Sequence, residues 1–312
     1  MTRVAEARRQ HRDRCANPWY VDFAMPPPRL FCFGFGYSAE ALAHHLSARE
    51  ITLAGTRTSL AQPPLLRGVQ LAKFQGETPS AEVRALLQGA THILVSIPPD
   101  LEGDVVLRHF RDDLGGMPDL AWIGYLSTVG VYGDWHGEWV DETSVCQPVS
   151  ERSLMRLKAE RAWLAFGTET GKRVELFRLS GIYGPGRSSV IDNLRAGTAR
   201  RIVKSGQVFN RIHVDDIARV LAAAMDKDAI HRIYNVSDDE PAPSQDVVAY
   251  AAELLGLPVP PEVPFAEAGL HGMAASFWAE SKRVRNDRIK RDLGVSLLYP
   301  TYREGLRAIA VT

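Results

Sequence analysis

Apolar and polar residues alternate in blocks along most of the chain. Short apolar runs such as RLFCF, ITLAGTR and THILVSI have the length of strands, and they alternate with segments such as AEALAHHLSARE, in which apolar residues recur at helical spacing. Near-continuous apolar strands separated by helices are typical of a parallel sheet with both faces covered. From Arg29 to about residue 180, the pattern therefore predicts an α/β fold with a doubly wound parallel sheet.

The regular alternation ends near residue 181. The segment GIYGPGRSS is typical of a loop, HVDDIARVLAAAMD and SQDVVAYAAELLG have helical spacing, and RIYNVSD has the pattern of one more strand. We expect a large lobe at residues 29–180 and a smaller C-terminal lobe at residues 181–312, from which one or two strands can return to the first sheet. Residues 1–28 are charged and end in three prolines, which predicts a disordered extension or, alternatively, a basic arm that docks on a partner.

Composition narrows the classes of partner. Thirty-seven basic and thirty-seven acidic side chains cancel, so no general field would attract the chain to nucleic acid or anionic lipid. No apolar run approaches the roughly 20 residues of a membrane span. Cys15, Cys32 and Cys146 are odd in number and lack metal-ligand spacing, which favours reduced thiols in the cytoplasm and no metal site. We expect a cytoplasmic protein whose partner is a small-molecule substrate, with no nucleic acid or membrane.

A glycine pattern lies at the junction between the first strand and the first helix. Gly34, Gly36 and Ala39 form Gly-x-Gly-x-x-Ala. In such a pattern the first glycine permits a tight turn, the second lets the backbone approach a pyrophosphate, and the small third residue allows close helix packing. The helix N-terminus then faces the phosphates. The pattern predicts a dinucleotide site; glycines that only turn the chain are the alternative.

The end of the second strand indicates which dinucleotide would bind. An NAD site usually carries an acidic residue about 20 residues after the glycines, where it binds the ribose hydroxyls. This chain has Ala54, Gly55, Thr56, Arg57 and Thr58 there. Because no carboxylate stands at that position and a guanidinium can pair with a 2′-phosphate, we expect NADP(H) to be preferred over NAD(H). Alternatively, Arg57 is an ordinary surface arginine.

Three further segments carry a recognisable combination of motifs: YLSTVGVYGD at 125–134, RLSGIYGPGR at 178–187 and NRIHVDDIA at 210–218. Together they resemble the short-chain dehydrogenase/reductase superfamily, and more narrowly its extended, NAD-dependent epimerase/dehydratase branch. The closing segment SKRVRNDRIKRDLGVSLLYPTYREGL is also similar to that branch. The resemblance runs from about Arg29 to the C-terminus. It implies a Rossmann-type fold with the active site between the lobes and hydride exchange with a nicotinamide, and it is compatible with a homodimer.

The resemblance also implies roles for individual residues. The family's Ser or Thr after the fifth strand, which hydrogen-bonds the substrate, corresponds to Thr128, although a threonine that only caps its own loop fits the same position. Tyr132 in the VYG motif is expected to pack rather than react, and Arg211 is a candidate for binding a substrate phosphate. The cofactor-binding residues indicated by the glycine pattern, the strand ends and the resemblance are Gly34, Gly36, Tyr37, Ser38, Ala39, Thr56, Arg57, Ser96, Pro98, Arg156 and Ser180.

The chain departs from this family at the usual catalytic pair, Tyr-x-x-x-Lys. Alignment of the following helix places Arg152 at the tyrosine position and Arg156 at the lysine position, whereas another register keeps Lys158 but puts Leu154 at the tyrosine position. A guanidinium stays protonated near neutral pH, so Arg152 can bind or polarise an anion but cannot act as a general base. Alternatively, the two arginines belong to a solvated row in which Glu160 pairs with Arg156.

Two other groups of polar residues are candidates for chemistry. The loop after VYG offers possible proton carriers, although hydrophilic loop residues are usually only solvated: Asp134, His136, Glu138 and Asp141. The HVDDIA segment contains His213, Asp215 and Asp216, which include metal-ligand types, but at a helix start these residues suit capping better.

Two functional hypotheses follow. The first is an NADP(H)-dependent oxidoreductase or epimerase-like enzyme for a small anionic or sugar-phosphate-like substrate, in which Thr128 holds the reacting oxygen, Arg152 stabilises its negative charge, and water or a nearby side chain handles the proton. The second is a non-catalytic protein that binds NADP(H) and reports redox state to a partner, which the missing tyrosine favours.

Overall fold

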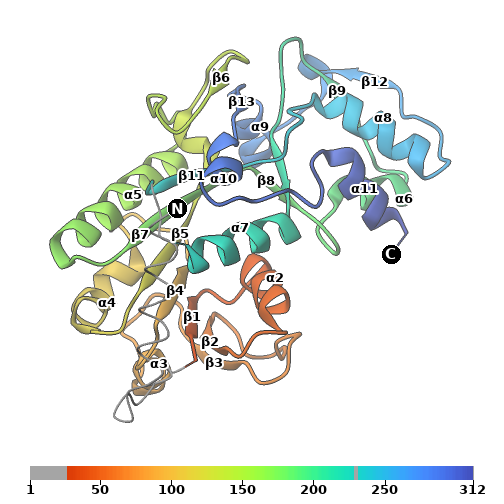
Figure 1. Cartoon of the computed structure of the whole chain (residues 1–312). Coiled ribbons are helices and arrows are strands. Elements are labelled where there is room, and N and C mark those ends of the chain that lie inside the picture. Colours follow the sequence, from red (N-terminus) through yellow and green to blue (C-terminus); the bar gives the residue numbers. More distant parts are fainter. Residues whose placement is uncertain (1–26, 228–230, 312) are drawn as a thin grey trace, which may run out of the picture.

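A seven-stranded parallel sheet forms the centre of the molecule (Figure 1). The computed structural model describes residues 27–227 and 231–311. The strands are β1 (Arg29–Phe33), β2 (Thr52–Arg57), β3 (Gln70–Lys73), β4 (His92–Val95), β5 (Trp122–Thr128), β7 (Val174–Leu179) and β11 (Ile233–Val236). Their spatial order is β11-β7-β5-β4-β1-β2-β3, and each neighbouring pair is parallel. The predicted doubly wound sheet is confirmed, and its strand order reverses between β1 and β4, where such folds bind ligands.

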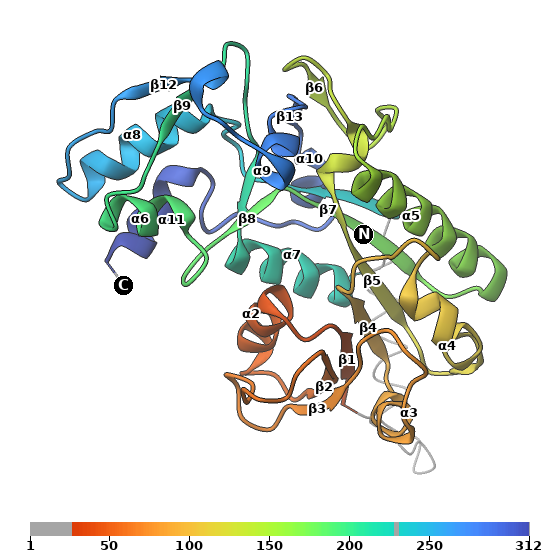
Figure 2. The same cartoon turned by 180° about the vertical axis from the view of Figure 1, so that it is seen from behind.

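Helices cover both faces of this sheet (Figures 1 and 2). One face packs against α3 (Ala81–Leu87), α4 (Val105–Gly116) and α5 (Glu151–Thr170), and the other against α2 (Tyr37–Leu46) and α7 (Val214–Asp226). Local signals set the helix ends: Ser150 accepts a hydrogen bond from the Ser153 amide at the start of α5, and Gly171 ends that helix in the left-handed conformation. Apolar side chains between the sheet and these helices therefore form two core layers that hold the strands in place.

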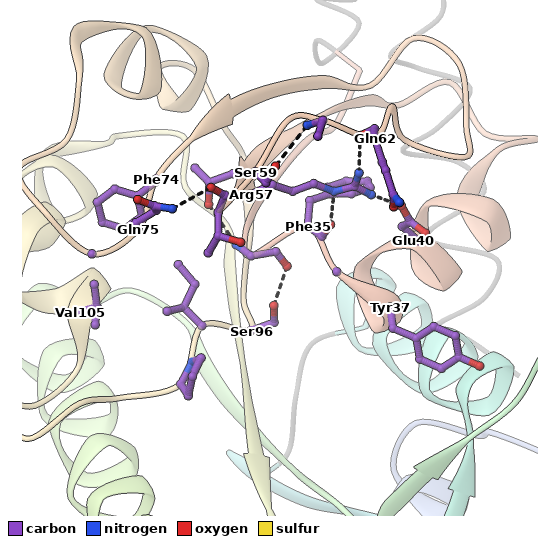
Figure 3. Close-up of a pocket in the computed structure, with 18 of the residues that line it drawn as sticks. Phe35, Tyr37, Glu40, Arg57, Ser59, Gln62, Phe74, Gln75, Ser96 and Val105 are labelled. Carbon is purple, nitrogen blue, oxygen red and sulfur yellow. Dashed lines mark hydrogen bonds and ion pairs between the residues drawn. The ribbon is translucent and has the colours of Figure 1, made fainter. Parts of the chain in front are cut away.

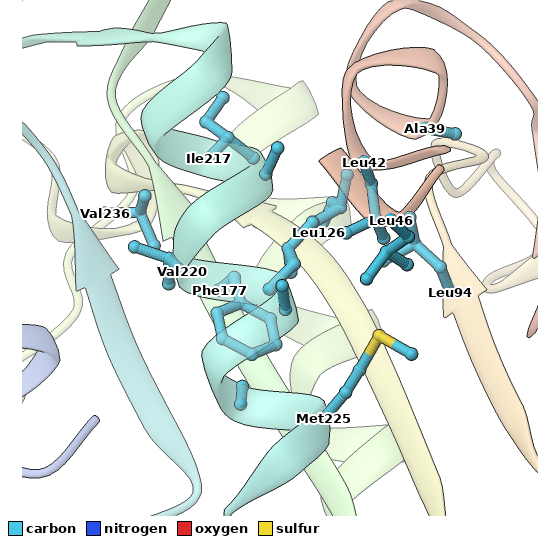
Figure 4. Packing of buried hydrophobic residues seen from close by; sticks show 14 of the residues in the cluster. Ala39, Leu42, Leu46, Leu94, Leu126, Phe177, Ile217, Val220, Met225 and Val236 are labelled. Carbon is cyan, nitrogen blue, oxygen red and sulfur yellow. The ribbon is translucent and has the colours of Figure 1, made fainter. Parts of the chain in front are cut away.

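The contact between α2 and α7 is the core of the face that carries the glycine turn (Figure 4). Ala39, Leu42 and Leu46 of α2 and Ile217 of α7 are all fully buried. Phe177 and other apolar residues of the sheet underlie both helices. Burial of one such large side chain contributes roughly 1.5–3 kcal/mol. A helix from the C-terminal part of the chain thus holds the helix that begins at the glycine turn.

The C-terminal part builds a second lobe from short elements, above α2 and α7 in Figure 1. Three two-stranded parallel ribbons join distant segments: β8 (Gly181–Tyr183) with β10 (Arg211–His213), β9 (Arg201–Val203) with β12 (Glu262–Pro264), and β6 (Trp139–Val140) with β13 (Arg283–Val284). The remaining helices are the 3-10 turns η1 (Val129–Tyr132) and η2 (Phe265–Glu267), with α6 (Ser189–Arg195), α8 (Ser244–Leu254), α9 (Gly272–Phe277), α10 (Asp287–Arg291) and α11 (Tyr302–Ala310).

The structure bears on several expectations about organisation. Every strand and helix expected within residues 29–180 is present, and β11 is the later strand that returns to the sheet. The segment GIYGPGRSS is not wholly a loop, because it begins with β8 and ends in the first residue of α6. The division at residue 180 stays a prediction. The expected N-terminal extension lies almost wholly outside the described residues, and none of the described helices is long and apolar enough to cross a membrane.

Candidate functional site

The glycine turn after β1 requires a glycine at its first position. Gly34 has a φ of +84°, and a β-carbon on it would lie 2.6 Å from the Ser96 Oγ atom. The Gly34 amide donates to the Thr56 Oγ1 atom at 3.0 Å, and the Ser96 hydroxyl donates to the Gly34 carbonyl at 2.5 Å. Thr56 and Ser96, both expected at the cofactor site, therefore act on the backbone of the turn and hold its shape.

The N-terminus of α2 is open to a ligand. Gly36 is the N-cap residue, and no side chain caps the helix. A β-carbon on Gly36 would meet nothing within 4 Å, so the backbone here borders free space. Ser38 and Ala39 are buried in the first turn, and Ala39 packs in the core as its small size predicts. The first amides of α2 are left for water or for an anion, which the helix dipole favours.

A cavity of about 990 Å³ adjoins this turn (Figure 3). Its lining includes seven of the residues expected to bind a cofactor: Gly34, Gly36, Tyr37, Thr56, Arg57, Ser96 and Pro98. Phe74, Gln75 and Val105 close the side opposite Tyr37. The volume lies at the upper end of the range for cofactor sites. The open helix end, the glycine turn and this volume together fit the adenosine and pyrophosphate parts of a dinucleotide.

Arg57 lines this cavity, and its guanidinium is paired with a carboxylate. The Arg57 guanidinium donates to the Phe35 carbonyl at 2.7 Å and to the Gln62 carbonyl at 3.0 Å, and it forms an ion pair with Glu40 of α2 (Figure 3). The side chains of both partners are mostly buried. No carboxylate stands at the end of β2, but the inference that none is present to repel a 2′-phosphate is wrong. The acid comes from the helix after the glycine turn instead of from the end of β2.

Thr128 lies at the end of β5, where the resemblance places it. Its Oγ1 atom accepts a hydrogen bond from the Gly130 amide at 3.1 Å, so the threonine does cap the turn η1. The hydroxyl hydrogen is still free to be donated, because Oγ1 acts only as an acceptor in that bond. A β-carbon on Gly130 would lie 2.7 Å from the Ser153 Oγ atom, so η1 packs tightly against the start of α5.

Arg152 and Arg156 differ sharply in their surroundings. Arg156 is half-buried, donates to the Leu126 carbonyl at 2.7 Å and lies 5.6 Å over the ring of Tyr125. Its guanidinium is therefore fixed against β5, two residues before Thr128. Arg152 is exposed, and it has no hydrogen bond or ion pair within the described residues. Of the two arginines, only Arg156 therefore borders the buried face of α5.

Glu160 does not pair with Arg156, so the solvated-row interpretation is wrong. Both carboxylate oxygens of Glu160 accept from Arg178 of β7, one of them at 2.7 Å, and the Ser127 hydroxyl donates to Glu160 at 2.5 Å. Arg178 also donates to the Tyr132 hydroxyl at 2.9 Å, and Tyr132 donates to Asn235 at 2.7 Å. This buried network ties α5, β5, β7 and β11 together. The network confirms that Tyr132 packs. Sequence reasoning missed the contacts among its other members.

Several residues expected to bind ligand do not line the cavity: Ser38, Ala39, Thr128, Arg152, Arg156, Ser180 and Arg211. Ser180 is buried with no hydrogen-bond partner for its hydroxyl among the described residues. Arg211 donates to the Phe209 carbonyl at 3.1 Å and the Ala242 carbonyl at 3.2 Å. Burial lowers the pKa of Arg211, and it raises the pKa of the neighbouring Asp238. Arg211 thus has structural partners, and its proposed contact with a substrate phosphate stays a prediction.

Four of the other polar candidates have structural partners, and apart from the cap at the start of α7 the sequence did not indicate them. His213 caps α7 by accepting from the Asp215 amide at 3.2 Å, and Asp216 accepts from the amides of Leu298 and Tyr299 at 2.6 and 2.9 Å. Asp134 accepts from the Ser281 amide at 2.8 Å, and Asp141 accepts from the Thr143 amide at 2.8 Å. Within residues 27–227 and 231–311 there is no group of three residues able to hold a metal ion.

Comparison with known proteins agrees with this architecture. The model of the NAD dependent epimerase/dehydratase family matches residues 121–237. The structure of a functionally unknown conserved protein from Silicibacter pomeroyi is 47% identical, covers 91% of this chain and 98% of its own, and has a TM-score of 0.84. A structure from Methylobacillus flagellatus assigned to the NAD-dependent epimerases/dehydratases is 25% identical, covers 92% and 98% of the two chains, and has a TM-score of 0.72.

Residues 121–237 thus match the NAD-dependent epimerase/dehydratase family, and the chain as a whole shares its fold with a structure assigned to that family. A relative with a named activity is the 3-diazoavenalumate denitrifying reductase of a Streptomyces species, which is 32% identical over 141 residues. That match covers 42% of this chain and 45% of the relative, so it spans less than half of either protein. In open α/β sheets of this kind, ligands bind in the crevice at the strand-order reversal, which here lies between β1 and β4.

Proposed function

We propose that this protein is an NADP(H)-dependent oxidoreductase, or an epimerase-like enzyme, for a small anionic substrate. The observation that carries the proposal is the cavity at the strand-order reversal, which opens onto the Gly34 turn and the uncapped end of α2. The match of residues 121–237 to the NAD dependent epimerase/dehydratase family supports a nicotinamide cofactor there. The name of the Streptomyces relative describes a reductase, which favours reduction over epimerisation.

We assign separate roles to the residues at the end of β5 and the start of α5. A bound nicotinamide would supply or accept a hydride. Thr128 donates its hydroxyl hydrogen to the reacting oxygen or nitrogen of the substrate, and Arg156 keeps the end of β5 in position through its bond to the Leu126 carbonyl. Arg152 binds the negative charge of the substrate, since its guanidinium is exposed and unpaired within the described structure. A proton, where one is needed, comes from water.

NADP(H) is the proposed cofactor form, and Arg57 is the residue that would recognise its 2′-phosphate. In support, Arg57 lines the cavity and is oriented by two backbone carbonyls. Glu40 opposes this preference for two reasons. Its carboxylate already pairs with the Arg57 guanidinium, and its negative charge would repel a phosphate. The preference therefore depends on whether the 2′-phosphate displaces Glu40.

The test combines turnover with one matched pair of variants. Purified protein is incubated with NADPH and a panel of carbonyl, carboxylate and sugar-phosphate compounds, and absorbance of the reduced nicotinamide is followed. For a substrate that reacts, we expect Arg152→Ala to lower kcat/KM about tenfold or more, because a charge-assisted contact is lost. Arg161→Ala removes an equally exposed cation from the same helix and should change nothing.

Two outcomes would count against the proposal. Failure of every compound to oxidise NADPH, together with tight binding that differs between oxidised and reduced cofactor, would favour the non-catalytic redox sensor instead. Equal loss of activity in Arg152→Ala and Arg161→Ala would show that Arg152 does not bind the substrate directly. The loss would then follow from the lower positive charge of the helix.

A further inference from the structure

The second lobe places a loop directly on the first residue of α2. The Tyr37 hydroxyl donates to the Pro185 carbonyl at 2.9 Å, and the guanidinium carbon of Arg187 lies 5.5 Å over the Tyr37 ring. Tyr37 is the first helical residue after the Gly36 N-cap. The loop that follows β8 therefore brings a cation next to the open helix end.

The close approach of this loop depends on glycine. Gly184 has a φ of +157°, and a β-carbon there would lie 2.4 Å from the Tyr37 Oη atom and 2.8 Å from the Val214 Cγ1 atom. The Arg187 amide donates to the Gly184 carbonyl at 3.0 Å, which closes the turn. Any larger residue at position 184 would lift the loop away from α2. The contact between Arg187 and Tyr37 is thus built into the backbone.

Arg187 differs from Arg57, the arginine that the sequence assigned to the 2′-phosphate of the cofactor. Arg57 is already engaged by Glu40 and two carbonyls. Arg187 is exposed, and within the described residues its guanidinium makes no hydrogen bond or ion pair. A dinucleotide pyrophosphate is doubly charged, and the helix end offers only partial positive charge. The Arg57–Glu40 pair adds no net charge, whereas Arg187 beside Tyr37 is a cation available to this anion.

We propose that Arg187 binds the pyrophosphate of the cofactor from the second lobe, opposite the backbone amides of α2. This inference rests on the proposed function, because it requires a dinucleotide at the glycine turn. The cofactor is then held between elements of both lobes, and Tyr37 is a positioning residue that supports the guanidinium through its ring. Stacking on an aromatic ring leaves the planar edge of the guanidinium free for bidentate contact with phosphate.

The test measures binding instead of turnover. Dissociation constants for NADP⁺, NADPH, adenosine diphosphate and adenosine are measured by calorimetry and competition, for the original protein and three variants. We expect Arg187→Gln to weaken both dinucleotides and adenosine diphosphate about tenfold or more, and to leave adenosine unchanged. Arg187→Lys should fall between the two, since it keeps the charge but loses the planar contact. Arg200→Gln, which removes an exposed second-lobe cation, is the matched control.

The outcomes separate the two proposals. If the original protein binds no nicotinamide dinucleotide at millimolar concentration, the proposed function and this inference both fall. If it binds and Arg187→Gln binds equally well, only this inference is overturned. An unchanged melting temperature without ligand is expected for Arg187→Gln, since the side chain is exposed. A variant that weakens adenosine as much as adenosine diphosphate would also overturn the inference, because the effect would not follow the phosphates.

Discussion

At the residue scale, the proposed recognition of a 2′-phosphate by Arg57 depends on the ion pair between Arg57 and Glu40. Replacement of Glu40 by glutamine removes the negative charge but keeps the size and a hydrogen-bond acceptor. We expect Glu40→Gln to raise affinity for NADP(H) relative to NAD(H) about tenfold, which corresponds to ~1.4 kcal/mol. Titration of both cofactors into both proteins measures the ratio. Glu50→Gln, an exposed carboxylate beyond the same helix, is the control; a fall in the NADP(H) preference of Glu40→Gln would contradict the argument.

The contrast between these two residues shows what the sequence could predict at the site. Arg57 and Gly34 were identifiable because their roles depend on a fixed spacing along a strand–turn–helix unit. Glu40 was missed because its relevance depends on which way the fourth residue of α2 faces. Helical geometry offered a signal, since a residue in the first turn of that helix borders the same crevice. Arg187 had no such signal, because its approach to Tyr37 depends on how two distant segments pack.

At the element scale, one buried ion pair joins α5 to the sheet. Arg178→Met leaves the Glu160 carboxylate buried without its partner, and we expect the free energy of unfolding to fall by about 3–5 kcal/mol. The double variant Glu160→Met with Arg178→Met removes both charges and should recover much of that loss. Urea unfolding of the original protein, the two single variants Arg178→Met and Glu160→Met, and the double variant gives a complete thermodynamic cycle. A double variant as unstable as Arg178→Met would show that packing, and not the uncompensated charge, sets the cost.

The N-cap of α7 makes stability depend on pH. Burial lowers the pKa of His213 below its usual value of 6.5, so the folded protein keeps this imidazole neutral while the unfolded chain takes up a proton. Stability is therefore fully present above about pH 6.5 and is lost as pH falls below it, by at most ~1.4 kcal/mol per pH unit. His213→Asn keeps a capping side chain without this titration. We expect its unfolding free energy, measured in urea from pH 8 to pH 5.5, to fall less steeply; parallel curves would exclude His213 as a source.

The long elements and the short ones differ in how far the sequence specifies them. Strands such as β1 and β4 and helices such as α7 follow from apolar periodicity, because each has enough residues to define one buried face. The ribbons β6–β13 and β9–β12 contain only two or three residues per strand. Their pairing is decided by contacts between segments far apart in the chain. No local pattern marks them, and the sequence did not predict them.

At the scale of the whole molecule, α7 connects the two lobes. It packs on α2 under the glycine turn, and its buried Asp216 accepts hydrogen bonds from the amides of Leu298 and Tyr299. Those residues lead into α11, which covers the apolar cluster of the second lobe. The helix α7, which packs under the glycine turn, and the C-terminal helix α11 are therefore linked through the Asp216 carboxylate. Binding of a dinucleotide should stabilise the fold, by ~2.7 kcal/mol at a concentration of 100 times Kd.

Loss of a hydrogen bond to Asp216 should destabilise the C-terminal segment locally and leave the central sheet unaffected. An asparagine at position 216 can accept at one oxygen only, so one of the two amides loses its partner at a cost of roughly 1–3 kcal/mol. We expect Asp216→Asn to accelerate amide hydrogen exchange about tenfold or more across residues 298–310, and to leave exchange in β1 and β4 nearly unchanged. Exchange followed by mass spectrometry locates the change. Asp226→Asn, at the other end of α7 and exposed, should leave exchange in residues 298–310 as it is. Uniform acceleration across the whole chain would instead show that the lobes open only together.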